Sequence, residues 1–156
     1  MSAPVHRAVR RLLLQGTAAL ALTRALPGIA APTPEIPDIP LLKELLGDRT
    51  PRWERLRLAL PALADNGLSV PLKLTMPGPF SPGPTVQAIH LFSEKNPVPD
   101  MAVFEYPVPI DKIEIDTRVR LAGTQKVVAV AVMSDQSLYA AAAEVIVTIA
   151  ACLDGS

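Results

Sequence analysis

Seven short segments of this chain either alternate apolar with polar residues or are apolar throughout. The alternation is clearest in residues 55–60 and 113–121, where every second side chain is apolar. A period of two places those side chains on one face of a β-strand. The seven segments are residues 55–60, 68–75, 86–92, 101–106, 113–121, 126–133 and 138–149. Short strands about ten residues apart, with turn residues between them, predict an all-β, immunoglobulin-like antiparallel β-sandwich of about seven strands.

The distribution of proline tells which strands can be central. The chain has 17 prolines, of which the last is Pro109, so residues 110–156 are free to form uninterrupted central strands. Pro71, in contrast, predicts an edge or a bulge for its strand. Residues 145–147 are apolar on consecutive positions, which predicts burial of the last strand on both sides. A domain this small needs a second chain to achieve that, so the same pattern predicts a partner.

The first 31 residues are typical of a signal peptide. A basic start that includes Arg10 and Arg11 precedes a short apolar stretch, and small residues at Ala30 and Ala31 suit cleavage. The apolar stretch, residues 12–22, is well short of the roughly 20 residues that cross a bilayer. The adjacent arginines favour the twin-arginine route, although an ordinary secretory signal remains the alternative. We therefore expect a periplasmic protein, cleaved near Ala30/Ala31, without membrane insertion after processing.

The processed chain divides into three parts. Residues 32–54 form a proline-spaced extended leader and a short helix at 40–47, which has proline at its start and glycine at its end. We expect Trp53, the only tryptophan, to anchor this part to the sandwich. Residues 55–149 form the β-domain, and residues 150–156 form a C-terminal arm.

Composition excludes several classes of function. Fifteen basic residues balance fifteen acidic ones, so no overall field recruits nucleic acid. A single cysteine, Cys152, excludes an internal disulfide and a thiolate-rich metal site, and we expect no cofactor. A lone thiol in an oxidising compartment tends to be capped or paired, which indicates that it has a use. The alternative is a buried cysteine that acts as a small hydrophobe.

Four segments resemble a known family. They are residues 61–71, 89–97 and 129–135, and residues 144–149 leading to Cys152. Together they resemble SoxY, the sulfur-carrier subunit of the bacterial thiosulfate-oxidising (Sox) system, over roughly residues 36–156. The resemblance implies an immunoglobulin-like sandwich in a heterodimer with a SoxZ-like β-sandwich subunit. It also implies a terminal cysteine that carries covalent sulfur adducts between periplasmic Sox enzymes, among them c-type cytochromes and a sulfate-releasing hydrolase.

The arm departs from the family pattern, in which glycines flank the cysteine. Here Ala150 and Ala151 precede Cys152, and Leu153 and Asp154 follow it. Alanine in place of glycine restricts the backbone, with an effect on the order of 0.5–1 kcal/mol per residue. We expect a stiffer arm, which bears on the identity of the partners more than on the carrying role.

The chemistry of these residues indicates a carrier and not an enzyme. His90 lies in the middle of an apolar strand, where a structural role is expected, and a Cys–His pair would need an orienting group. Asp154 and the terminal carboxylate oppose thiolate formation at Cys152, so activation has to come from a docked partner. The arginines of two alternating strands are expected on a solvated outer face. They are Arg55, Arg57, Arg118 and Arg120.

Two other hypotheses stay open. One is a non-covalent β-sandwich adaptor in which Cys152 is incidental. The other is a SoxY-like carrier paralogue for another periplasmic oxidation system.

Overall fold

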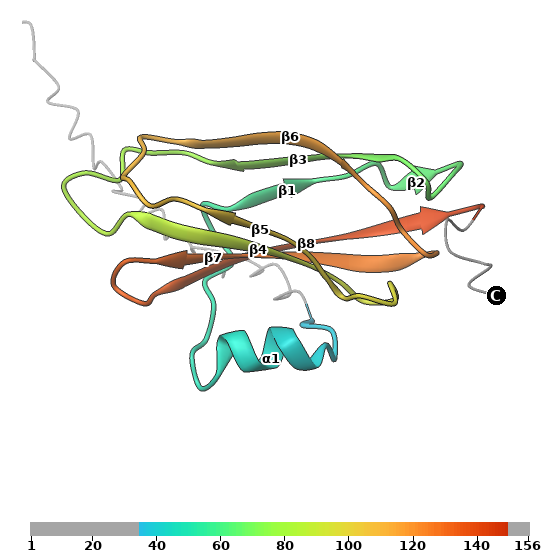
Figure 1. Ribbon diagram of the computed structural model, residues 1–156, viewed down its shortest axis with the longest axis horizontal. Helices are drawn as coiled ribbons and strands as arrows, with labels where there is room; N and C mark the ends of the chain where they lie inside the picture. The colour runs from blue at the N-terminus through green and yellow to red at the C-terminus, as the bar shows by residue number, and fades with distance from the viewer. Residues whose placement is uncertain (1–34, 150–156) are drawn as a thin grey trace, which may run out of the picture. The chain divides into compact units, whose positions relative to one another are not determined.

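The computed structural model of the protein describes residues 35–149. Eight strands form two sheets that pack face to face, and one helix lies against the outer face of the larger sheet (Figure 1). The elements in chain order are α1 (Pro40–Leu46), β1 (Arg57–Ala59), β2 (Leu63–Ala64), β3 (Val70–Met76), β4 (Val86–Ser93), β5 (Asp100–Glu105), β6 (Ile113–Val119), β7 (Gln125–Met133) and β8 (Leu138–Val147). The predicted all-β sandwich with a short preceding helix is confirmed.

The two sheets are unequal in size. The smaller sheet has the order β1-β3-β6, and the larger has the order β2-β8-β7-β4-β5. All pairs are antiparallel except β2 with β8, which is parallel and joins Leu63 to Ile146 and Ala64 to Val147. The seven predicted strands are present, and β2 is an eighth of only two residues. Four strands, β1, β2, β5 and β6, each have a free edge.

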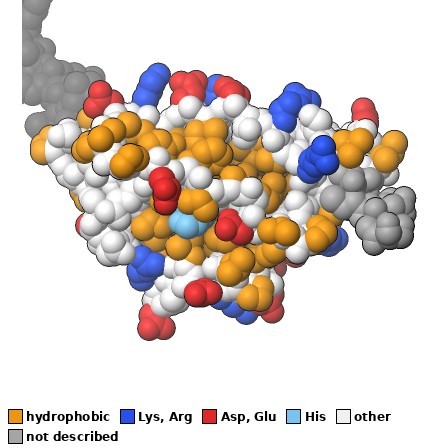
Figure 2. All heavy atoms as spheres, viewed as in Figure 1, with side chains coloured by type: hydrophobic (Ala, Val, Ile, Leu, Met, Phe, Trp, Pro, Cys, Tyr) orange, Lys and Arg blue, Asp and Glu red, His pale blue; other side chains and the backbone are white. Residues whose placement is uncertain are grey.

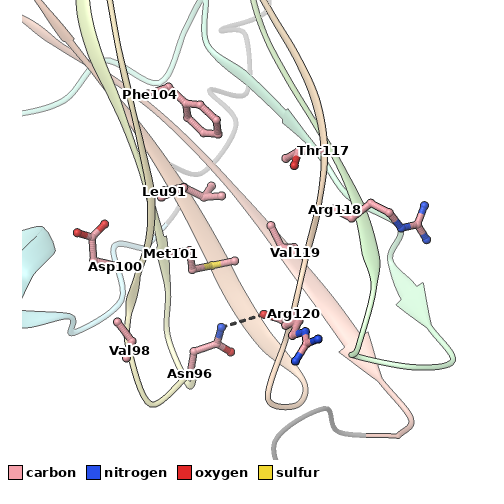
Figure 3. Close-up of a pocket in the computed structure, with 11 residues that line it drawn as sticks. Leu91, Asn96, Val98, Asp100, Met101, Phe104, Thr117, Arg118, Val119 and Arg120 are labelled. Atoms are coloured by element: carbon pink, nitrogen blue, oxygen red, sulfur yellow. Dashed lines mark hydrogen bonds between the residues drawn. The ribbon is translucent and has the colours of Figure 1, made fainter.

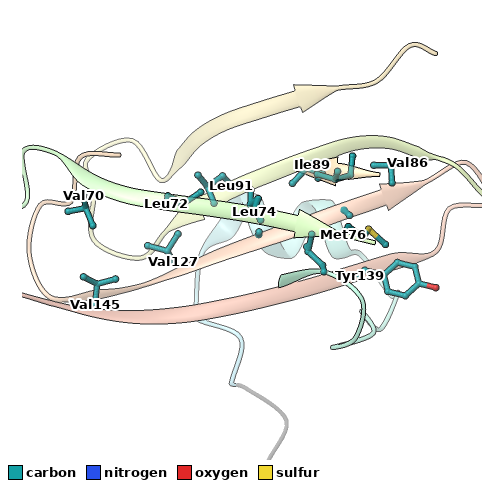
Figure 4. Close-up of a cluster of buried hydrophobic side chains, with 14 of the residues drawn as sticks. Val70, Leu72, Leu74, Met76, Val86, Ile89, Leu91, Val127, Tyr139 and Val145 are labelled. Carbon is teal, nitrogen blue, oxygen red and sulfur yellow. The ribbon is translucent and has the colours of Figure 1, made fainter. Parts of the chain in front are cut away.

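Aliphatic side chains from both sheets build the main core (Figure 4). Alternate residues of β3 point inward, and Val70, Leu72, Leu74 and Met76 are each at most 1% exposed. They pack against the inward residues of β4, β7 and β8, where Ala129 and Ala131 leave room for the larger leucines opposite. At about 25 cal/mol per Å² of apolar surface removed from water, this layer is the main stabilising contribution to the fold.

The helix covers part of the outer face of the larger sheet. Pro40 opens α1, and Gly47 closes it at φ +54°, where its amide donates to the Lys43 carbonyl at 2.9 Å. Leu42 and Leu46 are buried against the outward residues Val128 and Val130 of β7. β7 is therefore buried on both faces, because α1 supplies the second layer. Trp53 packs against the same cluster, as expected.

Pro71 does not lie on an edge strand, because β3 is the middle strand of its sheet. The prediction of an edge strand was therefore wrong, but at Pro71 itself β3 has a neighbouring strand on one side only. β1 pairs only with residues 73–75 of β3, so at Pro71 the sole partner is Arg118 of β6. On the β1 side no strand pairs with Pro71, so the missing N–H of proline costs no inter-strand hydrogen bond there.

Two polar side chains, Asn96 and Gln125, tie two loops together at one end of the sandwich. Asn96 accepts hydrogen bonds from the Ala122 amide (2.9 Å) and from Nε2 of Gln125 (3.0 Å), and its own amide donates to the Arg120 carbonyl (2.8 Å). Gln125 is 2% exposed and accepts from the Lys95 amide. Asn96 thus does more than form a turn: it links the β4–β5 and β6–β7 connections.

Candidate functional site

The candidate site is the end of β8, where the chain leaves the sandwich toward Cys152. Cys152 and the arm residues Ala150, Ala151, Leu153 and Asp154 lie outside the described residues. The structure therefore defines the base of the arm and the surface around it.

Hydrogen bonds fix the chain firmly up to Ile149. The Thr148 amide donates to the Ala64 carbonyl at 3.1 Å, and Oγ1 of Thr148 donates to the Asp65 carbonyl at 2.8 Å. The Ile149 carbonyl accepts from the Gly67 amide at 2.8 Å. These bonds come from β2 and from the Asn66–Gly67 turn, in which Oδ1 of Asn66 accepts from the Leu68 amide at 2.7 Å. The turn thus acts as a clamp on the last strand.

Covalent geometry limits how far Cys152 can be from this clamp. Cys152 is the third residue after Ile149, and at about 3.3–3.6 Å per residue these three steps span at most roughly 10 Å. A protein that acts on the thiol must therefore come within about that distance of Ile149.

The surface at the base of the arm is apolar. Leu63, Leu68, Ile146 and Ile149 are between 49% and 62% exposed. Leu63 is the register partner of Ile146, so their side chains lie next to each other on the outer face of the larger sheet. The single chain leaves the outer face of this half of β8 exposed, which is where the expected second chain would have to complete the burial. The physical reason is that α1 has only seven residues and covers the other half.

The predicted outer-face arginines are exposed, as expected. Arg118 donates to Oγ and to the carbonyl of Ser69, at 2.6 and 3.0 Å. On the same sheet, Lys73 donates to Glu114 at 3.1 Å and to Asp116 at 3.2 Å. The hydrogen bonds that Glu114 accepts from Lys73 and Lys112 lower the pKa of its carboxyl. Arg55 instead stacks over the rings of Phe80 and Tyr139, at 5.4 and 5.5 Å from the ring centroids. This surface is a solvated one, with its charges paired by ion pairs and hydrogen bonds.

A hollow of about 380 Å³ opens between the free edges of β5 and β6 (Figure 3). Leu91, Met101 and Val119 point into it, whereas the guanidinium groups of Arg118 and Arg120 point away. The two arginines therefore do not form an anion site in it. Within residues 35–149, no group of three or more His, Cys, Asp or Glu side chains is placed to hold a metal ion.

His90 lies on the outward face of β4, half-buried, with its ring stacked on Phe92 at a centroid distance of 6.1 Å. No side chain in the described part of the chain orients it by a hydrogen bond. No helix of the described region is long and apolar enough to cross a membrane.

The family model described as sulfur oxidation protein SoxY matches residues 42–152, which include most of the described sandwich and reach Cys152. The chain belongs to the SoxY family. The expected resemblance is thereby confirmed, with the matched region ending at the cysteine itself.

A solved structure agrees with this membership in the SoxY family. The sulfur carrier protein SoxY from Chlorobium limicola f thiosulfatophilum is 28% identical, with a TM-score of 0.56, and the match covers 70% of this chain and 96% of that one. Two more distant structures match over the sandwich. They are a superoxide reductase (neelaredoxin) from Ignicoccus hospitalis (12% identity, 60% and 80% coverage, TM-score 0.46) and a hypothetical protein from Pyrococcus horikoshii OT3 (13%, 67% and 98%, 0.48). Neither of these two informs the function. No curated protein sequence matches the chain.

Proposed function

We propose that this SoxY-family chain is a covalent sulfur carrier whose attachment point is the thiol of Cys152. The observation that carries the proposal is the position of Cys152 in the chain. The family match ends at the only cysteine, and that cysteine follows a strand end clamped by hydrogen bonds that Thr148 donates to the Ala64 and Asp65 carbonyls and that the Gly67 amide donates to Ile149. A short tether on a rigid base can present one atom to another protein without any movement of the domain.

The chemistry that this role requires comes from other proteins. Joining a thiolate to an anionic sulfur compound forms one S–S bond and releases two electrons, so an electron acceptor must take part. C-type cytochromes fit that need, and a hydrolase would free sulfate from the bound group. The carrier itself acts as a scaffold and not as an enzyme, in keeping with the stacked, unoriented His90.

A partner subunit is part of the proposal. Leu63 and Ile146 expose an apolar surface, and four strand edges lack neighbours. Natural proteins cover or blunt such edges. We propose a heterodimer with a SoxZ-like β-sandwich subunit, in a periplasm that the chain reaches through its N-terminal signal, cleaved near Ala30/Ala31.

Protein purified from its native host during growth on thiosulfate tests the covalent attachment, the heterodimer and the cleavage of the signal. Trypsin should release residues 127–156 as one peptide, because Lys126 is the last basic residue, and this peptide should carry sulfur-containing mass adducts. Light scattering should show a heterodimer, and N-terminal sequencing should begin near Ala31. An unmodified peptide in every growth phase would favour the non-covalent adaptor.

A further inference from the structure

We propose that a hollow between α1 and the β4–β5 edge binds a cationic side chain, preferentially the guanidinium of an arginine projecting from a partner protein. The hollow has a volume of about 330 Å³, within the range of ligand clefts, which begins at about 300 Å³. It lies on the outer face of the larger sheet, and this inference does not depend on Cys152. Its lining residues are Leu41, Glu44, Leu45, His90, Phe92 and Asp100.

The hollow exists because α1 is too short and too narrow to cover the whole sheet. Leu42 and Leu46 bury against β7, which leaves Leu41 45% exposed on the flank of the helix. Beyond that flank, β4 and β5 present their outward residues. Asp100 is the register partner of Phe92, so it shares the outer face with Phe92 and with His90 two positions before it.

Asp100 has an unmet requirement for a hydrogen-bond donor. Its Oδ1 is shielded from solvent and has no partner among the described residues, which is unfavourable for a carboxylate oxygen. The close-up of the neighbouring hollow shows the Asp100 carboxylate turned away from β6 and toward the helix side (Figure 3). Glu44 faces the same space from α1, and its carboxylate has no hydrogen bond or ion pair with any residue of the described range.

The floor of the hollow suits a flat cation. The half-buried ring of His90 lies 7° from parallel with the ring of Phe92, which is only 2% exposed, so the accessible aromatic surface is that of His90. Figure 2 shows the histidine in pale blue among hydrophobic side chains, with acidic side chains nearby. A guanidinium stacks on aromatic faces and donates to carboxylates in a planar fork, while its apolar stem packs against leucine.

A metal ion is a poorer occupant. Residues 35–149 contain no set of three or more His, Cys, Asp or Glu side chains close enough together to bind one. Two separate carboxylates and an apolar wall match a cation that carries an apolar stem. The charge complementarity therefore points to a basic side chain of another protein.

The test mixes the reduced chain with a short blocked peptide that contains one arginine. Binding is followed by the imidazole NMR signals of His90. These signals are assigned by their loss in His90→Gln. We expect saturable shifts with a dissociation constant in the millimolar range, roughly 1–10 mM, as befits one side chain. The same peptide with citrulline, which is neutral and nearly isosteric, should bind at least about fivefold more weakly.

Two variants and a control locate the site. Asp100→Asn and Glu44→Gln should each weaken binding at least about fivefold, while Glu105→Gln, an exposed carboxylate of the same strand outside the hollow, should change it less than about twofold. Glu44 is exposed on α1, so its variant stays informative even if Asp100→Asn unfolds. Equal shifts with citrulline, unchanged affinity in Glu44→Gln, or tighter binding of free spermidine than of the arginine peptide would overturn the assignment.

Discussion

Replacement of Cys152 by serine should reduce thiosulfate-dependent electron transfer in a reconstituted system to the background seen without the chain. Serine keeps the size of the side chain but removes the only sulfur nucleophile, and a hydroxyl does not form the S–S bond on which carriage depends. Cytochrome c reduction after addition of thiosulfate measures the effect.

The fold should not change in Cys152→Ser, because the sandwich and its two hydrophobic clusters are complete by Val147. The unfolding midpoint in urea should match that of the parent. Ser81→Ala, in an exposed loop before β4, serves as the control and should retain full electron transfer. Full activity of Cys152→Ser would rule out the carrier interpretation.

Leu74→Ala should cost about 2–5 kcal/mol of unfolding free energy. Leu74 is completely buried at the centre of β3, where it packs between the two sheets, and the aligned strands around it cannot collapse into the space left behind. Since domains of this size are stable by only about 5–15 kcal/mol, this change removes a large part of the total. Urea denaturation followed by circular dichroism measures it.

Leu68→Ala is the matched control for this prediction. It makes the same chemical change, but Leu68 is 49% exposed in the turn before β3. We expect a change of no more than about 0.5 kcal/mol. Similar losses in the two variants would mean that β3 does not form the centre of the core.

The strands could be predicted from the sequence because burial and period coincide in them. β6 alternates strictly, and β7 is apolar on both faces because one face meets the other sheet and the other meets α1. Pro40 and Gly47 likewise marked both ends of the helix. In each case a local pattern had one structural explanation.

Features that depend on distant residues could not be predicted. β2 has two residues, too few to show a period, and its parallel pairing with β8 joins residues more than 80 positions apart. The exposure of Ile146 depends on how far α1 extends, which the apolar run around it does not encode. The same holds for Pro71, whose environment depends on where β1 stops.

The two candidate sites also differ in whether the sequence could reveal them. Cys152 stood out in the sequence because it is the only cysteine, and its role came from the resemblance to SoxY. The hollow that contains Asp100 gave no signal, because Glu44, His90 and Asp100 come from three separate elements. Glu44 by itself has the pattern of a solvent-facing helix residue.

Transfer of labelled sulfur tests the central claim most directly. The chain, its partner subunit and the cytochromes are incubated with [³⁵S]thiosulfate, and the chain is then denatured and separated under non-reducing conditions. A covalent carrier retains the label after denaturation, releases it to dithiothreitol, and shows none in Cys152→Ser. Label that disappears on denaturation, or that is equal on the serine variant, would contradict covalent carriage on Cys152.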